Sequence, residues 1–228
     1  MISSAEREGQ LRVGCRELGL EPTDQQVSQL LAYLDLIAKW NKVYNLTAVR
    51  PDEMLGQHLL DSLAVIGPLR RQIGGKTARL LDVGSGAGLP GVVIAVCCPE
   101  IQVDCVDTVG KKAAFIQQAA AQLLVSNLRG MHDRVENLAG PYDVIASRAF
   151  ASLPDFVRWS NGALAEHGVW LAMKGKRPDA ELAELPPEAE VFHVEQLSVP
   201  GLDAERCIVW MRKPPSAESA TGLPAGGR

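Results

Sequence analysis

The residues best suited to chemistry lie in one short stretch, Arg79–Gly91, which reads RLLDVGSGAGLPG. It begins as an apolar run interrupted by Asp82 and continues with glycine at alternate positions, namely Gly84, Gly86 and Gly88. Glycine lets the backbone approach a ligand closely and adopt positive φ angles. A buried strand that turns through glycines into a helix is typical of the nucleotide-binding βα turn of an open α/β sheet.

The spacing of these glycines is compatible with two kinds of cofactor. Gly86, Gly88 and Gly91 fit the G-x-G-x-x-G pattern of dinucleotide-binding proteins. The form acid-x-Gly-x-Gly-x-Gly, from Asp82 to Gly88, instead resembles motif I of class I S-adenosylmethionine (SAM) methyltransferases. Asp107 follows the next predicted strand, about 20 residues beyond the glycines, where a ribose-binding acid is expected. Because that acid suits NAD as well as SAM, and can also cap the following helix, it supports the fold more than the cofactor.

Basic side chains follow other predicted strands. Ligands of open α/β sheets bind beyond the carboxyl ends of the strands, so these residues are expected to share one rim. Arg148 directly follows the apolar run 144–146, and Lys174 ends the next strand. The predicted rim also includes Lys111, Lys112, Lys176 and Arg177. Such a rim suits a polyanionic substrate even though the net charge of the chain is −4.

The pattern downstream of Arg79 predicts the elements that position these groups. Short apolar strands alternate with helices, which implies an α/β fold with a mostly parallel sheet and helices on both faces. Two β-rich runs, 191–199 and 206–212, lack a strong helix between them and indicate an antiparallel hairpin at one edge. The other strands are expected at 80–83, 102–106, 128–132, 142–147 and 168–173, and the helices at 90–98, 110–124, 153–160 and 178–184.

The first 70 residues are predicted to be helical. Thr23 and Gln26 fit a capping box, and apolar residues then recur at helical spacing. A further helix is expected to end near Gly67 and to carry His58 and Asp61 on one face, within hydrogen-bonding reach. A catalytic pair and a structural polar pair explain that spacing equally well. The predicted organisation is a helical extension packed on the core (1–70), a core (71–213) and a disordered tail (214–228).

Composition restricts the compartment. A chain of 228 residues can bury one good core. Its polar N-terminus does not resemble a signal peptide, and no apolar run approaches the roughly 20 residues of a membrane span. The five cysteines show neither metal-ligand spacing nor a C-x-x-C motif, which is typical of reduced thiols. These features predict a cytoplasmic protein without membrane contacts or a bound metal, and we expect it to be a monomer.

Stretches spread over nearly the whole chain resemble the RsmG (GidB) family of bacterial ribosomal RNA methyltransferases. The glycine stretch 82–91 is shared with many methyltransferases, whereas the NLT and SRAFASL stretches are more specific. The matching stretches are KWNKVYNLTAVR (39–50), HLLDSL (58–63), DVGSGAGLPG (82–91), SRAFASL (147–153), LAMKG (171–175) and VPGLDAER (199–206). The resemblance implies a class I methyltransferase fold with seven strands, SAM as the cofactor, and 16S rRNA of the small ribosomal subunit as the partner.

The resemblance also implies a role for each candidate residue. Gly84 and Leu89 line the methionine side of SAM, and the loop from Gly84 to Gly88, with Gly86 at its centre, binds the cofactor. Asp107 holds the ribose, Val135 and Glu136 face the adenine, and Arg148 lies between cofactor and RNA. Arg148 and Lys174 are the candidate catalytic residues, because either could donate to guanine O6 or hold a flanking phosphate.

The implied methyl acceptor, guanine N7, suits a site that is poor in acid–base groups, because N7 carries a lone pair and no proton. Exocyclic amines are usually methylated beside an Asp/Asn-Pro-Pro-aromatic turn, where this chain has 147–150, SRAF. Pyrimidine C5 needs a cysteine nucleophile, and none follows the fourth or fifth strand. A ribose hydroxyl would benefit from a base, for which Lys174 could be recruited.

Other functions stay open at this point. They are SAM-dependent methylation of another RNA site, a protein or a small molecule, a dinucleotide oxidoreductase, and a non-catalytic SAM-binding regulator. A chain of net charge −4 lacks the broad positive surface that sequence-independent RNA affinity requires. An assembled small subunit is therefore expected to be a better substrate than free RNA.

Overall fold

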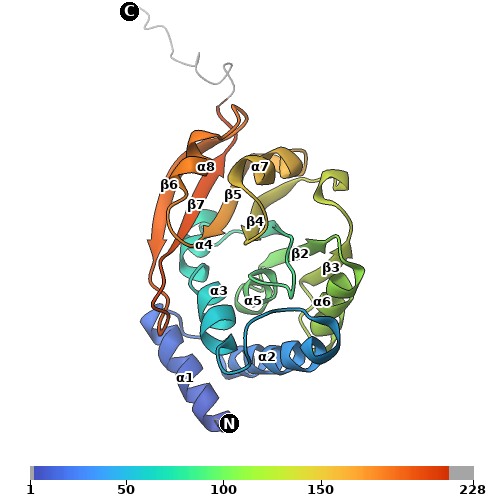
Figure 1. Ribbon diagram of the computed structural model, residues 1–228, viewed down its shortest axis with the longest axis vertical. Helices are drawn as coiled ribbons and strands as arrows, with labels where there is room; N and C mark the ends of the chain where they lie inside the picture. Colours follow the sequence, from blue (N-terminus) through green and yellow to red (C-terminus); the bar gives the residue numbers. More distant parts are fainter. Residues whose placement is uncertain (1–2, 216–228) are drawn as a thin grey trace, which may run out of the picture.

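Seven strands form one twisted sheet in the computed structural model, which describes residues 3–215 (Figure 1). Their order is β3-β2-β1-β4-β5-β7-β6, and β7 runs antiparallel to both of its neighbours while the other pairs are parallel. This confirms the predicted mostly parallel sheet with an antiparallel pair at one edge. The strands are β1 (Ala78–Val83), β2 (Ile101–Asp107), β3 (Leu128–His132), β4 (Tyr142–Arg148), β5 (Leu164–Lys174), β6 (Glu190–Leu197) and β7 (Arg206–Arg212).

Helices cover both faces of the sheet, because successive residues of a buried strand point to opposite faces. In β1, Leu80 belongs to the core on one face and Leu81 to the core on the other. The first face is covered by α5 (Gly91–Cys97) and α6 (Gly110–Gln122) together with the N-terminal helices. The second face is covered by α7 (Leu153–Ser160), α8 (Asp179–Ala183) and the 3-10 turn η2 (Val135–Asn137).

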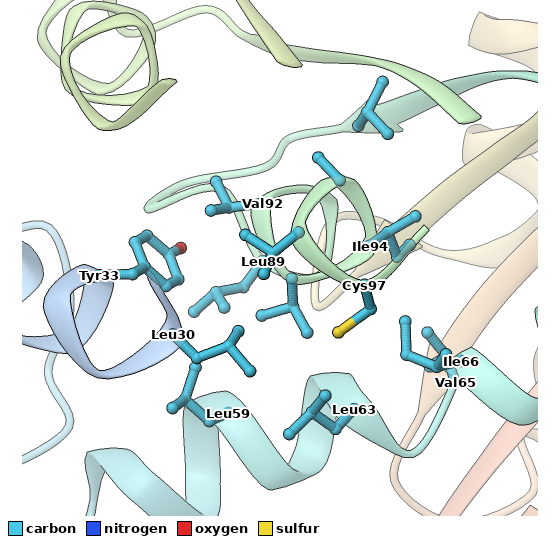
Figure 2. Packing of buried hydrophobic residues seen from close by; sticks show 14 of the residues in the cluster. Leu30, Tyr33, Leu59, Leu63, Val65, Ile66, Leu89, Val92, Ile94 and Cys97 are labelled. Carbon is cyan, nitrogen blue, oxygen red and sulfur yellow. The ribbon is translucent and has the colours of Figure 1, made fainter. Parts of the chain in front are cut away.

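The N-terminal helices share one continuous core with α5. Figure 2 shows Leu30 and Tyr33, together with Leu59 and Leu63, converging on the segment around Leu89. Since these residues are buried together, the extension is part of the folding unit rather than a separate layer. Its elements are α1 (Ser4–Glu17), α2 (Asp24–Tyr44), the π-helix η1 (Leu55–Leu60), α3 (Asp61–Leu63) and α4 (Ile66–Ile73).

Side chains of α2 also satisfy backbone groups of the sheet domain. The last carbonyls of a helix have no partner within it. Gln26 donates to Val96 O of α5 over 3.0 Å, and Gln29 donates to Leu123 O, just beyond α6, over 2.7 Å. The buried Tyr33 hydroxyl donates to Ala87 O in the glycine loop at 2.5 Å. The extension therefore anchors the loop predicted to bind the ligand.

The helix that the sequence predicts to end near Gly67 ends earlier, at Leu63. A new helix, α4, begins at Ile66 and runs to Ile73. Pro68 lies in its first turn, where the missing N–H removes no helical hydrogen bond, so the proline that suggested an end is tolerated. The predicted tail, 214–228, lies outside the described residues from 216 on. Across residues 3–215, no helix combines the length and the apolarity that crossing a bilayer would need.

Candidate functional site

Two adjoining cavities lie beyond the carboxyl ends of the parallel strands. Their volumes are about 590 and 410 Å³, and Gly84, Lys112 and Ala149 line both. The larger cavity is also bounded by η1 and by the segment that precedes it. All eight predicted site residues line these cavities: Gly84, Gly86, Leu89, Arg148 and Lys174 the larger one, and Gly84, Asp107, Val135 and Glu136 the smaller one.

The glycine loop depends on glycine for two different reasons. Gly84 and Gly86 have φ angles of 64° and 58°, which lie in the left-handed region that favours glycine. A Cβ atom on Gly84 would collide with the Phe150 ring, so this glycine permits close packing. A Cβ atom on Gly86 would meet no protein atom within 4 Å, and Gly86 lines the larger cavity. The backbone at Gly86 is thus exposed to any ligand in that cavity.

Asp107 fixes the glycine loop against the start of α6. Its Oδ2 accepts a hydrogen bond from Gly86 N at 3.0 Å, and its Oδ1 accepts one from Val109 N at 2.9 Å. Lys112 Nζ lies 3.6 Å from Oδ2. The carboxylate is buried and lines the smaller cavity. Because each carboxylate oxygen can accept more than one hydrogen bond, these contacts leave capacity for a ligand hydroxyl.

A buried carboxylate, Asp61, joins two arginines beside the larger cavity. It accepts from Arg148 Nη1 at 2.8 Å and from Arg206 Nε at 2.7 Å, and it is 4% exposed. Arg148 Nη1 also donates to Gln57 O of η1 at 3.1 Å. The predicted hydrogen bond between His58 and Asp61 is wrong, because the two ring nitrogens of His58 face Thr47 and Gln57 instead.

His58 bonds instead to the segment that precedes η1. Its Nε2 lies 2.9 Å from Thr47 Oγ1, and that oxygen also accepts from Val49 N at 3.1 Å. Burial, and then the charge of Arg148, lower the pKa of His58 to about 4. The ring is neutral at pH 7, and with the proton on Nδ1, which faces Gln57 O, Nε2 accepts from the Thr47 hydroxyl. This arrangement holds the segment around Thr47 in place along one wall of the larger cavity.

Lys174 fixes the segment that follows β4. Its Nζ lies 2.8 Å from Glu181 Oε2 and donates to Ala151 O at 3.0 Å. Glu181 also accepts from Leu153 N at 2.6 Å. Within this segment Ala149 has φ 52°, a conformation that non-glycine residues seldom adopt. The contacts of Lys174 and Glu181 hold the strained turn between the two cavities.

Most of the predicted basic rim is neutralised within the protein. Four of its six cations lie in ion pairs, namely Lys112 with Asp107, Arg148 with Asp61, Lys174 with Glu181, and Arg177 with Asp179. Lys39 and Lys42, which the sequence analysis did not assign to the rim, are exposed near the end of α2. Neither forms an ion pair with another residue of the 3–215 range. Leu46 and Thr47, soon after that end, line the larger cavity.

Sequence reasoning missed several residues around the larger cavity. Thr47, Gln57 and Arg206 all line it, although they lie far from the glycine loop in the chain. Thr47 and Arg206 belong to the NLT and VPGLDAER stretches, which carried the family resemblance. Resemblance in distant stretches was thus an available signal that these segments converge on one site.

Asp82 is a buried acid beneath the glycine loop. Its Oδ2 accepts from Gly91 N at 2.9 Å, whereas its Oδ1 has no hydrogen-bond partner among the described residues. Burial raises the pKa of Asp82 to about 7, against the opposing effects of the Gly91 N–H and of Arg148. The group thus keeps its proton over much of the pH range in which a free aspartic acid is ionised.

No group of three or more His, Cys, Asp or Glu side chains within residues 3–215 is placed to hold a metal ion.

Comparison with known proteins identifies relatives and a fold. Residues 26–209 match the family described as rRNA small subunit methyltransferase G. A protein named ribosomal RNA small subunit methyltransferase G, from Polaromonas sp. strain JS666, is 65% identical over 226 residues, which cover 96% of this chain and 98% of the relative. Another of that name, from Paracidovorax citrulli, is 63% identical over 221 residues, covering 92% of this chain and 91% of the relative.

Solved structures share the fold at low sequence identity. TrmN from Thermus thermophilus has a TM-score of 0.55 at 18% identity, with 70% of this chain and 53% of that one covered. Ribosomal protein L11 methylase from Lactobacillus delbrueckii subsp. bulgaricus has a TM-score of 0.52 at 13% identity, with 68% and 79% covered. The likeness concerns the fold alone and, with the strand order, confirms the class I methyltransferase architecture.

Asp82→Asn is expected to change how stability depends on pH. In the parent, the native state retains a proton that the unfolded chain releases above pH 3.8, so this group's contribution to the unfolding free energy falls as pH rises towards 7. His58, with its lowered pKa, contributes the opposite slope between about pH 4 and 6.5, so the informative quantity is the difference between variant and parent.

From pH 5 to pH 8, Asp82→Asn should gain about 2–3 kcal/mol of unfolding free energy relative to the parent, since each pKa unit corresponds to about 1.4 kcal/mol. Urea denaturation at pH 5, 6, 7 and 8 measures this difference. Parallel pH profiles for the two proteins would show that Asp82 does not titrate in this way.

Proposed function

This chain belongs to the rRNA small subunit methyltransferase G family, and on that premise we propose that it transfers a methyl group from SAM to N7 of a guanine in 16S rRNA. The match over residues 26–209 carries the proposal. Family membership supports a methyltransferase acting on small-subunit rRNA. The cofactor contacts and the choice of N7 are supported by the cavities and by the chemistry of the residues that line them.

The glycine loop and the two cavities fit SAM. In our proposal the smaller cavity takes the adenosine part, with Asp107 binding the ribose and Val135 and Glu136 next to the adenine. Gly84, Gly86 and Leu89 then contact the methionine end in the larger cavity. The open space at Gly86 Cα and the remaining acceptor capacity of Asp107 support this placement. SAM supplies an electrophilic methyl group carried by a sulfonium.

The side chains around the larger cavity support N7 rather than an atom that must lose a proton. His58 is held by the Thr47 hydroxyl, and Asp61 is bound by two arginines. Neither is available as a general base in this arrangement. Guanine N7 requires none, so the protein has mainly to unstack the base, align it and exclude water.

We infer that Arg148 contacts the RNA, whereas Lys174 acts by positioning. Only Nη1 of Arg148 forms hydrogen bonds with the residues that the structure describes, so Nε and Nη2 can donate to guanine O6 or to a phosphate. Lys174 holds Ala151 and Glu181 and so fixes the segment after β4. Arg206 shares Asp61 with Arg148 and keeps the carboxylate in place.

We further propose that the assembled small subunit, in the cytoplasm, is the substrate. Four of the six rim cations are already paired with acids of the protein, and the net charge is −4. Little positive charge is left for sequence-independent attraction to RNA. The shape of an assembled particle can let the enzyme recognise its target without that general attraction to RNA.

The function is tested by offering labelled SAM with small subunits that lack the modification, with protein-free 16S rRNA and with whole ribosomes. We expect label in 16S rRNA, with small subunits as the best substrate. Borohydride reduction followed by aniline should cleave the product, because this treatment breaks chains at 7-methylguanosine. Label that resists cleavage would contradict N7, and label in protein or small molecules would support the alternative acceptors.

Gly86→Val is expected to abolish SAM binding while leaving the core folded. The side chain would occupy the cavity at a backbone angle that β-branched residues avoid. Gly75→Val is the matched control, because Gly75 also has positive φ and open space around it but precedes β1, at the other end of that strand. Both variants carry strain of about 1–3 kcal/mol. Calorimetric titration showing equal SAM affinity for the two would contradict the assignment.

Arg148→Ala is expected to reduce methyl transfer roughly 100-fold, as loss of a well-placed donor does in other enzymes, while SAM affinity changes little. Arg148→Lys should not restore activity, because an ammonium lacks the planar fork of donors. Arg148→Ala and Lys174→Ala should both lower thermal stability, the first because the buried Asp61 loses one of its two arginines and the second because the strained turn is freed. Arg148→Lys keeps a cation beside Asp61 and so separates the loss of activity from the loss of stability. Single-turnover rates, SAM affinity and melting temperatures distinguish these outcomes. Lost SAM binding with intact RNA binding would make Arg148 a cofactor residue only.

A further inference from the structure

A third cavity, of about 770 Å³, lies on the other side of η1 from the candidate site. It is a surface groove between α1, η1 and the loop that connects β6 to β7. Gln57 lines both this groove and the larger cavity of the site. A single π-helix thus separates the two.

The floor of the groove is apolar. Val13 of α1 is 44% exposed there, and Leu55, Leu60 and Leu202 contribute from the other two segments. The residues of α1 that line the groove lie at positions 6, 9, 10, 13, 14 and 17, which is one stripe of a helix. Val13 is the large apolar side chain of that stripe, and it faces the leucines of the other two segments. An exposed apolar patch of this kind is a typical feature of a protein–protein contact.

The rim of the groove is acidic. Glu6, Glu17, Asp52 and Glu53 line it, and no lysine or arginine is among its lining residues. Arg50, outside the groove, shares its charge between Asp52 and Glu53 at 3.3 and 3.1 Å. Glu17 is exposed and has no basic partner within residues 3–215. The groove therefore repels phosphate groups and favours a cationic occupant.

We propose that this groove binds a basic protein segment of the small ribosomal subunit, with an aliphatic side chain on the floor and lysine or arginine against the rim. The inference rests on the proposed function, because a particle that brings RNA to the site also brings its proteins next to η1. An RNA strand is disfavoured by like charge at the rim. Protein contacts at the groove would add affinity and specificity for the subunit. The basic residues around the candidate site do not supply these, because most of them are paired with acids of the protein.

The decisive experiment reverses the charge of the groove. The double variant Glu17→Lys/Asp52→Lys changes two exposed side chains and leaves the apolar floor intact. Its affinity for purified, unmodified small subunits should fall about five- to tenfold, because each reversal removes an attraction and adds a repulsion. The matched control is Glu184→Lys/Glu188→Lys, which adds the same charge at two exposed positions outside the groove.

The direction of the change identifies what faces the groove. If the groove variant binds small subunits more tightly than the control variant does, RNA phosphates face the groove and the proposal is wrong. If the two variants bind equally well, the groove faces solvent in the complex and the proposal is also wrong. Affinity for protein-free 16S rRNA, measured alongside, should not fall below that of the control. A parallel loss on naked RNA would contradict a protein partner.

The apolar floor provides an independent test. Val13→Gln keeps a residue that is compatible with a helix and removes a branched apolar contact from α1. It should weaken subunit binding two- to threefold, or about 0.4–0.7 kcal/mol by RT ln of that ratio, and leave SAM affinity unchanged. Unchanged subunit binding would exclude the floor from the contact. Parent protein that neither binds nor methylates small subunits would instead refute the proposed function itself.

Discussion

The carboxylate of Asp61 holds three parts of the chain around the larger cavity. It belongs to the N-terminal extension, and its two oxygens bind Arg148 at the end of β4 and Arg206 at the start of β7. A carboxylate that is 4% exposed is stable as an anion only when it is paired and hydrogen-bonded. The two arginines meet that requirement. The N-terminal extension, the parallel part of the sheet and the antiparallel strand β7 must therefore come together in one arrangement.

The glycine loop is fixed from several directions before any ligand arrives. Tyr33 binds Ala87 O from the extension, Asp107 binds Gly86 N from β2, and Asp82 binds Gly91 N from below. A loop whose backbone groups are already held loses little conformational freedom on binding. Such preorganisation is what a site needs when its chemistry relies on alignment more than on proton transfer.

The sequence was sufficient for the sheet and for the strand-to-helix turn, because each depends on local periodicity or on a short motif. The glycines at 84 and 86 and the acid at 107 do lie together at the carboxyl end of the sheet. Ion pairing was not predictable. Asp61 is 87 residues from Arg148 and 145 from Arg206, and no local pattern connects them. The predicted basic rim carries less free positive charge than the sequence suggested, because the acids that pair with its cations could not be identified from local patterns.

Strand direction determines which end of a strand supplies residues to this site. The parallel strands present their last residues, whereas the antiparallel β7 presents its first, Arg206, with Cys207 opposite Lys174. The connection that leads into β7 therefore spans from the groove, at Pro200 and Leu202, to the cavity at Arg206. As a hairpin loop, its middle can vary in length without disturbing the sheet. We expect changes of docking preference among relatives to be concentrated there, while Asp61 constrains its final residue.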